Sequence, residues 1–289
     1  MKRTLSLLMA VLMLTAVVLT GCSSGGTTSG AASSDASSAS SEAESESSAA
    51  EENDLLAQIK EKGTITVAME GTWAPWTYHD VDDNLVGYDV EVAQNIAEKL
   101  GVEVNFVEGE WDGLLAGLDD GRYDIMVNGV GVTEERAEKY NFSTPYAYNR
   151  TAVIVRGDYD EINSMEDLEG KTTANTISST YATLAEAHGA TVTGVDDLNQ
   201  TIELLLSGRI DATLNAEVVF ADYVKEHPEA DIKIATFSDE VEKVAIPIRK
   251  GDDTATLLAA VNDALKEMSE DGTLTALSEK YFGTDISKA

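Results

Sequence analysis

The chain has 289 residues, enough for one or two domains, and its hydrophobic content of 43% is sufficient for ordinary folded cores. It carries 20 basic residues against 52 acidic ones, a formal net charge of −32. An acidic surface of this kind is repelled by nucleic acid and by anionic lipid headgroups. The composition therefore argues against nucleic acid as a partner.

The first residues have the pattern of a secretory signal. Lys2 and Arg3 give a basic start, residues 5–18 are almost all apolar, and the small residues of Leu19-Thr20-Gly21 precede Cys22. We interpret residues 1–21 as a signal peptide, because the apolar run is too short to be a comfortable membrane-spanning helix. Loss of two basic residues with this signal makes the mature chain −34.

Cys22 is the only cysteine, so it has no intramolecular disulfide partner. The Leu-Thr-Gly-Cys run resembles a bacterial lipobox, which implies cleavage before Cys22 and lipidation of its thiol. The alternative is a free cysteine after an ordinary signal peptide. Residues 22–52 follow with Ser, Ala, Gly, Thr, Glu and Asp and no large apolar side chain after Cys22, a composition that predicts a disordered tether.

The next part of the chain alternates strand and helix patterns, which predicts an α/β fold with a doubly wound sheet. A loop rich in aromatic residues, Gly and Pro, at 69–76, follows the first strand, and Gly101 ends the first helix. The predicted strands are 64–68, 102–107 and 123–127, and the predicted helices are 88–100 and 111–118.

A second strand–helix series begins where a predicted strand at 151–155 leaves the first lobe. Residues 244–248 are predicted to return to it, so that two connections form a hinge. Helices near 254–269 and 274–281 would then pack on the first lobe. The second series consists of strands 171–175, 191–195, 211–214 and 232–235 and helices 178–188, 196–207 and 215–226.

The motif Asn128-Gly-Val-Gly-Val-Thr133-Glu-Glu-Arg136 lies where the 123–127 strand ends. Glycine there lets the backbone come close to a small molecule. Thr133 is a suitable helix cap, and Arg136 falls three residues later on the same face. Exposed N–H groups and one guanidinium would bind a carboxylate. The alternative interpretation is a surface turn with a solvated arginine.

This motif and the Asn141-Phe-Ser-Thr-Pro-Tyr146 run after it resemble the signature of the polar amino-acid family of solute-binding proteins of ABC transporters. The resemblance extends over about residues 55–283. It implies the two-lobed type II periplasmic-binding-protein fold, with two doubly wound lobes joined by a two-strand hinge and a ligand between them. Lobe 1 would comprise residues 53–147 and 244–289, and lobe 2 residues 148–243.

The resemblance also implies the roles of individual residues in binding an amino acid. Arg136 would bind the ligand α-carboxylate, helped by backbone N–H groups of Gly129 and of Gly131 or Thr133. A helix N-terminus at Ser179 and Thr180 would add further donors from the second lobe, although both residues also suit helix capping alone.

Three tryptophans lie near strand ends. The resemblance places an aromatic wall at Trp73 and Trp111, whereas Trp76 suits either packing or ligand contact. Glu70 follows the first strand, where family members place a carboxylate for an amino group. The alternative for Glu70 is a solvated surface acid.

One position departs from the family pattern. Family members usually carry an aspartate that holds the α-ammonium at the position of Ala216. Glu70, Asn215 or Glu217 would have to replace it.

The runs MEGTWAPWTYHD, GEWDGLLAGLDDGRYDIMVNGVGVT and NTISSTYA resemble the cystine-binding branch of the family, although that branch often has Gln where this chain has Gly129. L-cystine is therefore the first choice of ligand, and another polar or aromatic amino acid is the alternative. The expected protein is a monomeric, lipid-anchored receptor on the outer face of the cell membrane, which delivers its ligand to an ABC permease with its ATPase.

No enzyme signature supports catalysis. His79, His188 and His227 have no metal-ligand spacing, and no P-loop or nucleophile motif is found, so we expect no metal, no cofactor and no enzyme activity. Some proteins of this fold are dehydratases, and an extracellular sensor is a further alternative, so the fold alone does not decide function.

Overall fold

The computed structural model describes residues 54–289. The predicted signal peptide 1–21, the lipidation site Cys22 and the tether 22–52 lie outside the described residues. All described residues fall within one compact unit of the chain. Among them, no helix is both long enough and apolar enough to cross a bilayer.

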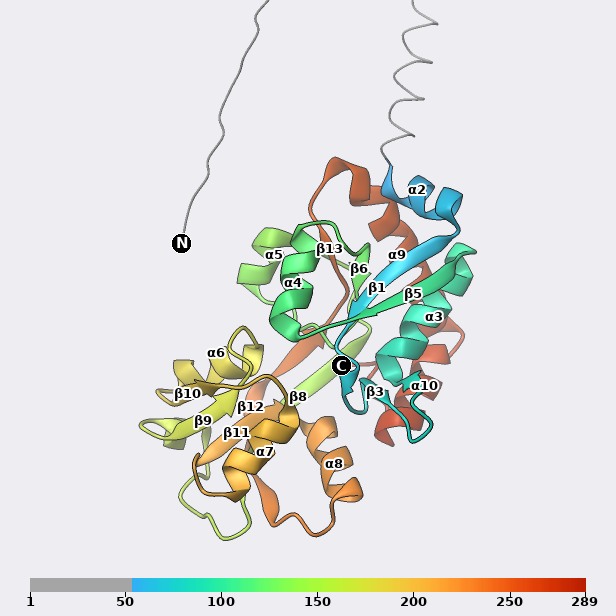
Figure 1. The fold of residues 1–289 in the computed structure, drawn as a ribbon. Coiled ribbons are helices and arrows are strands. Elements are labelled where there is room, and N and C mark those ends of the chain that lie inside the picture. The colour runs from blue at the N-terminus through green and yellow to red at the C-terminus, as the bar shows by residue number, and fades with distance from the viewer. Residues whose placement is uncertain (1–53) are drawn as a thin grey trace, which may run out of the picture. The chain divides into compact units, whose positions relative to one another are not determined.

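The first sheet is built around β1 (Thr64–Met69), which pairs in parallel with β5 (Glu103–Glu108) and β6 (Ile125–Met126). Side chains of a strand alternate between its faces. Ile65, Val67 and Met69 accordingly belong to one hydrophobic cluster with α3 (Tyr88–Leu100), whereas Ala68 packs with α4 (Trp111–Asp119). Helices thus cover both faces of this sheet (Figure 1).

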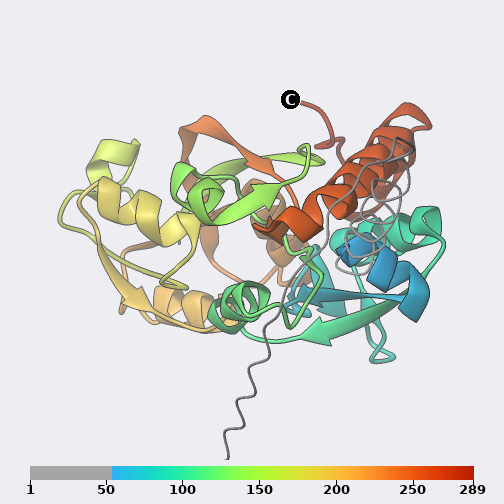
Figure 2. The same cartoon turned by 90° about the horizontal axis from the view of Figure 1, so that it is seen from above.

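The two C-terminal helices pack against the N-terminal part of the described residues. Helices α9 (Ala255–Glu270) and α10 (Thr273–Phe282) contribute Leu257, Val261 and Leu274 to the same cluster as β1 and α3. Figures 1 and 2 show α9, in red, beside α2 (Leu55–Lys62), in blue. The Thr256 hydroxyl donates to the Asp54 carboxylate, which connects these two helices.

Short elements surround the carboxyl end of β1. A three-stranded antiparallel meander lies between β1 and α3, and a short helix precedes an antiparallel strand pair. The meander comprises β2 (Thr72–Trp73), β3 (Thr77–His79) and β4 (Leu85–Val86); the others are α5 (Glu134–Lys139), β7 (Tyr140–Phe142) and β13 (Pro247–Arg249).

The second sheet has the order β10-β9-β11-β8-β12. Its β8 shows the same alternation: Val153 and Val155 pack with Ala185 of α6, and Ala152 and Ile154 pack with Leu205 of α7. Its elements are β8 (Ala147–Arg156), β9 (Thr172–Asn175), β10 (Thr191–Gly194), β11 (Ala212–Ala216) and β12 (Ile232–Val244), with η1 (Met165–Leu168), α6 (Thr180–Ala187), α7 (Leu198–Leu206) and α8 (Glu217–Glu226).

The two longest strands, β8 and β12, connect the two sheets. They pair antiparallel from Ala147↔Val244 to Arg156↔Ile232, with irregular register at two places in β12. At the Val244 end, β12 also bridges to Gly131, which follows β6. The segment after β6 is therefore hydrogen-bonded directly to the strand that returns from the second sheet.

Most predicted elements are present, and some of them differ in extent or type. The strand predicted at 123–127 is only Ile125–Met126 long. Asn215 and Ala216 were predicted to begin a helix but end strand β11, because they pair with Ala152 and Thr151 of β8. The return crossing predicted at 244–248 is made mainly by β12, and the 3-10 turn η2 (Asp252–Thr254) follows β13.

Candidate functional site

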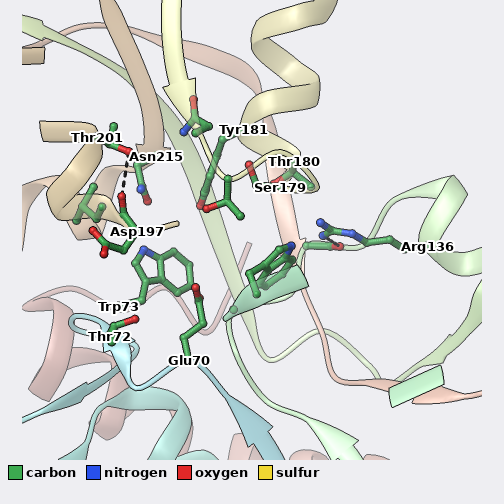
Figure 3. A pocket seen from close by; sticks show the side chains of 16 residues that line it. Glu70, Thr72, Trp73, Arg136, Ser179, Thr180, Tyr181, Asp197, Thr201 and Asn215 are labelled. Atoms are coloured by element: carbon green, nitrogen blue, oxygen red, sulfur yellow. Dashed lines mark hydrogen bonds between the residues drawn. The ribbon is translucent and has the colours of Figure 1, made fainter. Parts of the chain in front are cut away.

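A cavity lined by residues from both sheets lies between their elements. Figure 3 shows Arg136, Ser179 and Thr180 on one side of it and Asp197, Thr201 and Asn215 on the opposite side. The lining residues are Glu70, Thr72, Trp73, Trp111, Gly129, Gly131, Arg136, Asn175, Thr176, Ser179, Thr180, Tyr181, Asp197, Leu198, Thr201 and Asn215. All predicted ligand-contacting residues except Thr133 are among them.

Arg136 is held in place by backbone carbonyls. Its Nη1 donates to Gly131 O and its Nη2 to Ser178 O, each at 2.9 Å, and the guanidinium lies 5.2 Å from the centre of the Trp111 ring. Burial lowers the pKa of Arg136 from its usual value. Since a guanidinium has five N–H donors, several remain for a ligand.

Thr133, which was predicted to contact the ligand, is not among the residues that line this cavity. Its side chain caps α5 by accepting the Arg136 N–H at 3.1 Å, and the residue lines a different pocket together with residues 238–243 of β12. Thr133 therefore positions the backbone from which Arg136 extends.

Gly129 contributes space to the cavity. Its φ of +55° lies in the left-handed region, and a Cβ built there would overlap the Trp73 ring. Its N–H donates to Asp89 Oδ2 at 2.5 Å, so this predicted backbone donor is already used within the protein. The branch's usual Gln at this position would conflict with the placement of Trp73.

Gly131 leaves its own N–H without a hydrogen-bond partner among the described residues, so this donor remains for a ligand. A Cβ on Gly131 would overlap the carboxyl group of Glu242, a residue of β12 that lines a different pocket. Burial raises the pKa of Glu242, while hydrogen bonds from Thr180 and Asn149 and the charge of Arg136 oppose that rise. Glu242 thus lies close to Gly131 and Arg136, which are both predicted to bind the ligand carboxylate.

Helix α6 begins at the cavity wall. The Ser179 hydroxyl caps it by accepting the Ala182 N–H at 3.1 Å, and Thr180 is its first residue. The first N–H groups of a helix have no partner within it and carry a partial positive charge. The N-terminus of α6 and the Arg136 guanidinium therefore both favour binding of an anion on this side of the cavity.

Glu70 is clamped by Asn128, which is fully buried after β6. The Asn128 Oδ1 accepts the Glu70 N–H, and its Nδ2 donates to Glu70 Oε2, both at 2.7 Å. Burial raises the pKa of Glu70 to about 7; the Asn128 hydrogen bond lowers it, and the charges of Asp197 and Asp112 raise it further. A cation bound beside Glu70 would stabilise its ionised form, which burial otherwise disfavours.

The tryptophans divide into two roles. Trp73 and Trp111, for which the resemblance implies an aromatic wall, both line the cavity, and the Trp111 Nε1 has no partner among the described residues. Trp76 is fully buried, stacks on Trp73 at a ring distance of 5.5 Å and contacts Phe282 at 4.9 Å. Trp76 therefore supports Trp73 from the core.

Of the two residues beside Ala216, only Asn215 lines the cavity. Its Oδ1 accepts the Ala216 N–H at 2.8 Å, which leaves its NH2 group to face a ligand. Glu217 instead forms a two-bond pair with Arg150 and lines a different pocket.

Asp197, Asn175 and Thr201 line the cavity but were not predicted as ligand contacts. The available signal for Asp197 was its position as a helix cap, which is common to many acids and carries no information about a cavity.

Among residues 54–289, no group of three or more His, Cys, Asp or Glu side chains is arranged to hold a metal.

The fold and the cavity define a two-lobed α/β binding protein: doubly wound lobes, a hinge of paired strands, and a small-molecule site between them. The profile of the bacterial extracellular solute-binding proteins, family 3, matches residues 65–284, and the chain belongs to this family. This confirms the predicted family and the fold class.

Individual relatives agree with this assignment. The L-cystine-binding protein TcyA of Bacillus subtilis (strain 168) is 43% identical over 240 residues, which cover 83% of this chain and 88% of TcyA. The L-cystine solute receptor of Neisseria gonorrhoeae, solved in the unliganded open conformation, is 41% identical with a TM-score of 0.57, covering 82% of this chain and 99% of the receptor. The chain thus resembles the cystine-binding branch.

A third similar structure has a different ligand. An ancestral arginine-binding protein bound to arginine is 37% identical, with a TM-score of 0.71, and covers 76% of this chain and 99% of its own. Amino-acid binding is common to these relatives, which are solute-binding proteins.

The Tyr146 hydroxyl is predicted to stabilise the turn that carries Gly129. It donates to Asp89 Oδ1 at 2.7 Å, and Asp89 accepts the Gly129 N–H from the other side. Tyr146→Phe removes one donor from a fully buried carboxyl group, so we expect the free energy of unfolding to fall by about 1–3 kcal/mol. Urea unfolding at neutral pH measures this change.

The matched control is Tyr148→Phe. Tyr148 is half-buried and its hydroxyl has no hydrogen bond among the described residues, so its loss should change stability by less than about 0.5 kcal/mol. Equal effects of the two substitutions would contradict the role of Tyr146.

Proposed function

We propose that this protein is the extracytoplasmic receptor of an ABC importer and that it captures an amino acid, with L-cystine as the first choice. The observation that carries the proposal is the separation of charge in the cavity. Its lining contains one basic side chain, Arg136, beside the N-terminus of α6, and two carboxyl groups, Glu70 and Asp197. An amino-acid zwitterion has a carboxylate that matches the basic side chain and an ammonium group that matches a carboxyl group.

In this proposal the ligand α-carboxylate binds the remaining N–H donors of Arg136. The free N–H of Gly131 and the first N–H groups of α6, beside Ser179 and Thr180, complete its hydrogen bonds. Bonds of this charge-assisted kind each contribute about 1.5–3 kcal/mol. The carboxylate therefore fixes one end of the ligand.

The α-ammonium pairs with Glu70, which Asn128 holds at the carboxyl end of β1. Trp73 and Trp111 supply apolar contact on the remaining sides, and Trp76 keeps Trp73 in place by stacking. Glu70 thereby replaces the aspartate that the family usually carries at the position of Ala216.

The cystine assignment and the cellular arrangement rest on the relatives and on the amino terminus. TcyA and the gonococcal receptor are described as binding L-cystine, and the 19–22 run resembles a lipobox. In the arrangement we propose, a lipid on Cys22 anchors the protein at the outer face of the cell membrane. The tether 22–52 carries the two lobes, divided as 53–147 with 244–289 and as 148–243, to the permease.

Binding and delivery follow from lobe closure. A ligand shifts the protein toward a closed state only through contacts that the closed state makes and the open state lacks. Here the contacts from α6 and from β11 are supplied by the second sheet, whereas Arg136 and Glu70 come from the first. The ligand therefore connects the two, and the closed protein is the form offered to the permease.

A thermal-shift screen tests the proposed function. The chain without residues 1–21 is heated with each common amino acid, L-cystine and small carboxylates. A ligand at 100 times its dissociation constant should stabilise the protein by about 2.7 kcal/mol. Stabilisation by L-cystine supports the first choice, another amino acid supports the receptor with a different ligand, and the absence of any shift contradicts the proposal.

Arg136→Ala should weaken ligand binding by about 2–4 kcal/mol, because it removes the cationic partner of a desolvated carboxylate. Isothermal titration with the ligand found in the screen measures the loss. The control is Arg122→Ala, since Arg122 pairs with Asp120 on the surface and does not line the cavity. We expect less than about 1 kcal/mol from the control, and an unchanged affinity in Arg136→Ala would refute the carboxylate site.

Affinity should depend on pH through Glu70. The pKa of Glu70 is about 7 in the empty cavity, and pairing with an ammonium requires the ionised form, so binding must expel a proton below that pH. We expect the affinity to fall between pH 7.5 and 5.5, by up to about tenfold per pH unit. Glu70→Gln should bind more weakly at pH 7.5 and lose most of this dependence. A wild-type affinity that is constant over this range would exclude the pairing.

A further inference from the structure

Asp197 lies at the end of the cavity opposite Arg136 (Figure 3). In an α-amino acid the carboxylate and the ammonium are attached to the same carbon atom. A ligand whose α-carboxylate binds Arg136 therefore has its α-ammonium near that same end. Asp197 faces a different part of the ligand.

The hydrogen bonds of Asp197 leave its negative charge unpaired. Its Oδ1 accepts the Gln200 N–H at 2.9 Å as the cap of α7, and its Oδ2 accepts from Gln200 Nε2 at 3.3 Å. Among residues 54–289 its carboxylate pairs with no Lys, Arg or His, and the only basic residue that lines the cavity is Arg136, on the far side.

A second carboxyl group is close enough to respond to this charge. The charge of Asp197 raises the pKa of Glu70, and Asp112, whose carboxylate accepts the Ser178 hydroxyl, adds to the effect. Carboxyl groups that line one cavity and lack a cation disfavour each other's ionised form, so each is stabilised by a ligand group that brings a positive charge.

A buried acceptor near this end is also without a partner. Asn175 is 4% exposed, and its Oδ1 has no hydrogen bond among the described residues, while its Nδ2 donates to Leu214 O at 2.7 Å. Leu214 precedes Asn215, whose NH2 group faces the cavity. A buried acceptor without a donor is costly, and a ligand N–H group would satisfy it.

We propose that Asp197 determines specificity for the far end of the ligand by holding a second ammonium group. Asn175 is the additional acceptor for that ammonium, and the Asn215 NH2 group is the donor for a carboxylate beside it. The site therefore selects a ligand with amino groups at both ends over one of the same length with a single amino group. This inference rests on the proposed amino-acid receptor and restricts its substrate class.

Asp197→Asn tests the charge without removing the helix cap, because Asn caps helices as well as Asp does. Two probes are compared by isothermal titration: L-cystine, and the mixed disulfide of L-cysteine with 3-mercaptopropionate, which lacks one amino group. We expect the wild type to prefer L-cystine by at least about tenfold. In Asp197→Asn this preference should fall to about twofold or less, with little change in affinity for the single-amino probe.

Asp196→Asn is the matched control. Asp196 is the neighbouring acid, is exposed, accepts from Gln200 Nε2 at 3.3 Å and does not line the cavity, so it should keep the wild-type preference. An Asp197→Asn variant that keeps its preference, or that loses both probes equally, would overturn the inference and leave the receptor function standing.

The ligand screen separates the two levels of the proposal. If it selects a different diamino ligand such as lysine, the same comparison is made with lysine and norleucine, and the same loss of preference is expected. If the best ligand has a single amino group, the inference is overturned while the amino-acid receptor is supported. If no amino acid binds, both are rejected.

Discussion

The buried carboxyl group of Asp89 is the constraint on which the placement of Gly129, Trp73 and Arg136 in the site depends. It lies in the first turn of α3, accepts the Gly129 N–H and the Tyr146 O–H, and so joins α3, the turn after β6 and the start of β8. Burial raises its pKa to about 7, and these two hydrogen bonds oppose the rise. Because Gly129 is fixed in this way, the Trp73 ring can lie against its backbone and the following turn leads to Arg136.

The polar residues of the cavity come from equivalent places in the two sheets. Glu70 follows β1, Gly129 follows β6 and Asp197 follows β10. Asn175 is the last residue of β9, and Asn215 is the last but one of β11. In open α/β sheets the carboxyl ends of strands are the usual ligand-binding edge. The fold thus gathers residues that are far apart in the sequence, and the short helices beside them add charge of either sign.

Sequence patterns were reliable where one local signal decided the structure. Residues 88–100 were predicted to be helical from their apolar spacing and from Gly101, and α3 has those bounds. Asn215 and Ala216 were misassigned because pairing with β8, a distant segment, determines their conformation. Arg136 was selected from its motif. Asp197 was not selected, because a helix-capping acid looks like any other cap in the sequence and lines the cavity only through the packing of the two sheets.

The bond from Arg136 Nη2 to Ser178 O joins the two sheets without a ligand atom, and the Ser178 hydroxyl extends this connection to Asp112 on α4. Arg136 therefore holds the two sheets together in addition to the ligand-binding role proposed for it. To let a bound ligand escape, the protein must break these protein–protein bonds in addition to the ligand's own. In the proposed receptor, a contact that holds the two sheets together independently of the ligand would lengthen the residence time of any ligand, whatever its side chain, and release would require Ser178 to separate from Arg136.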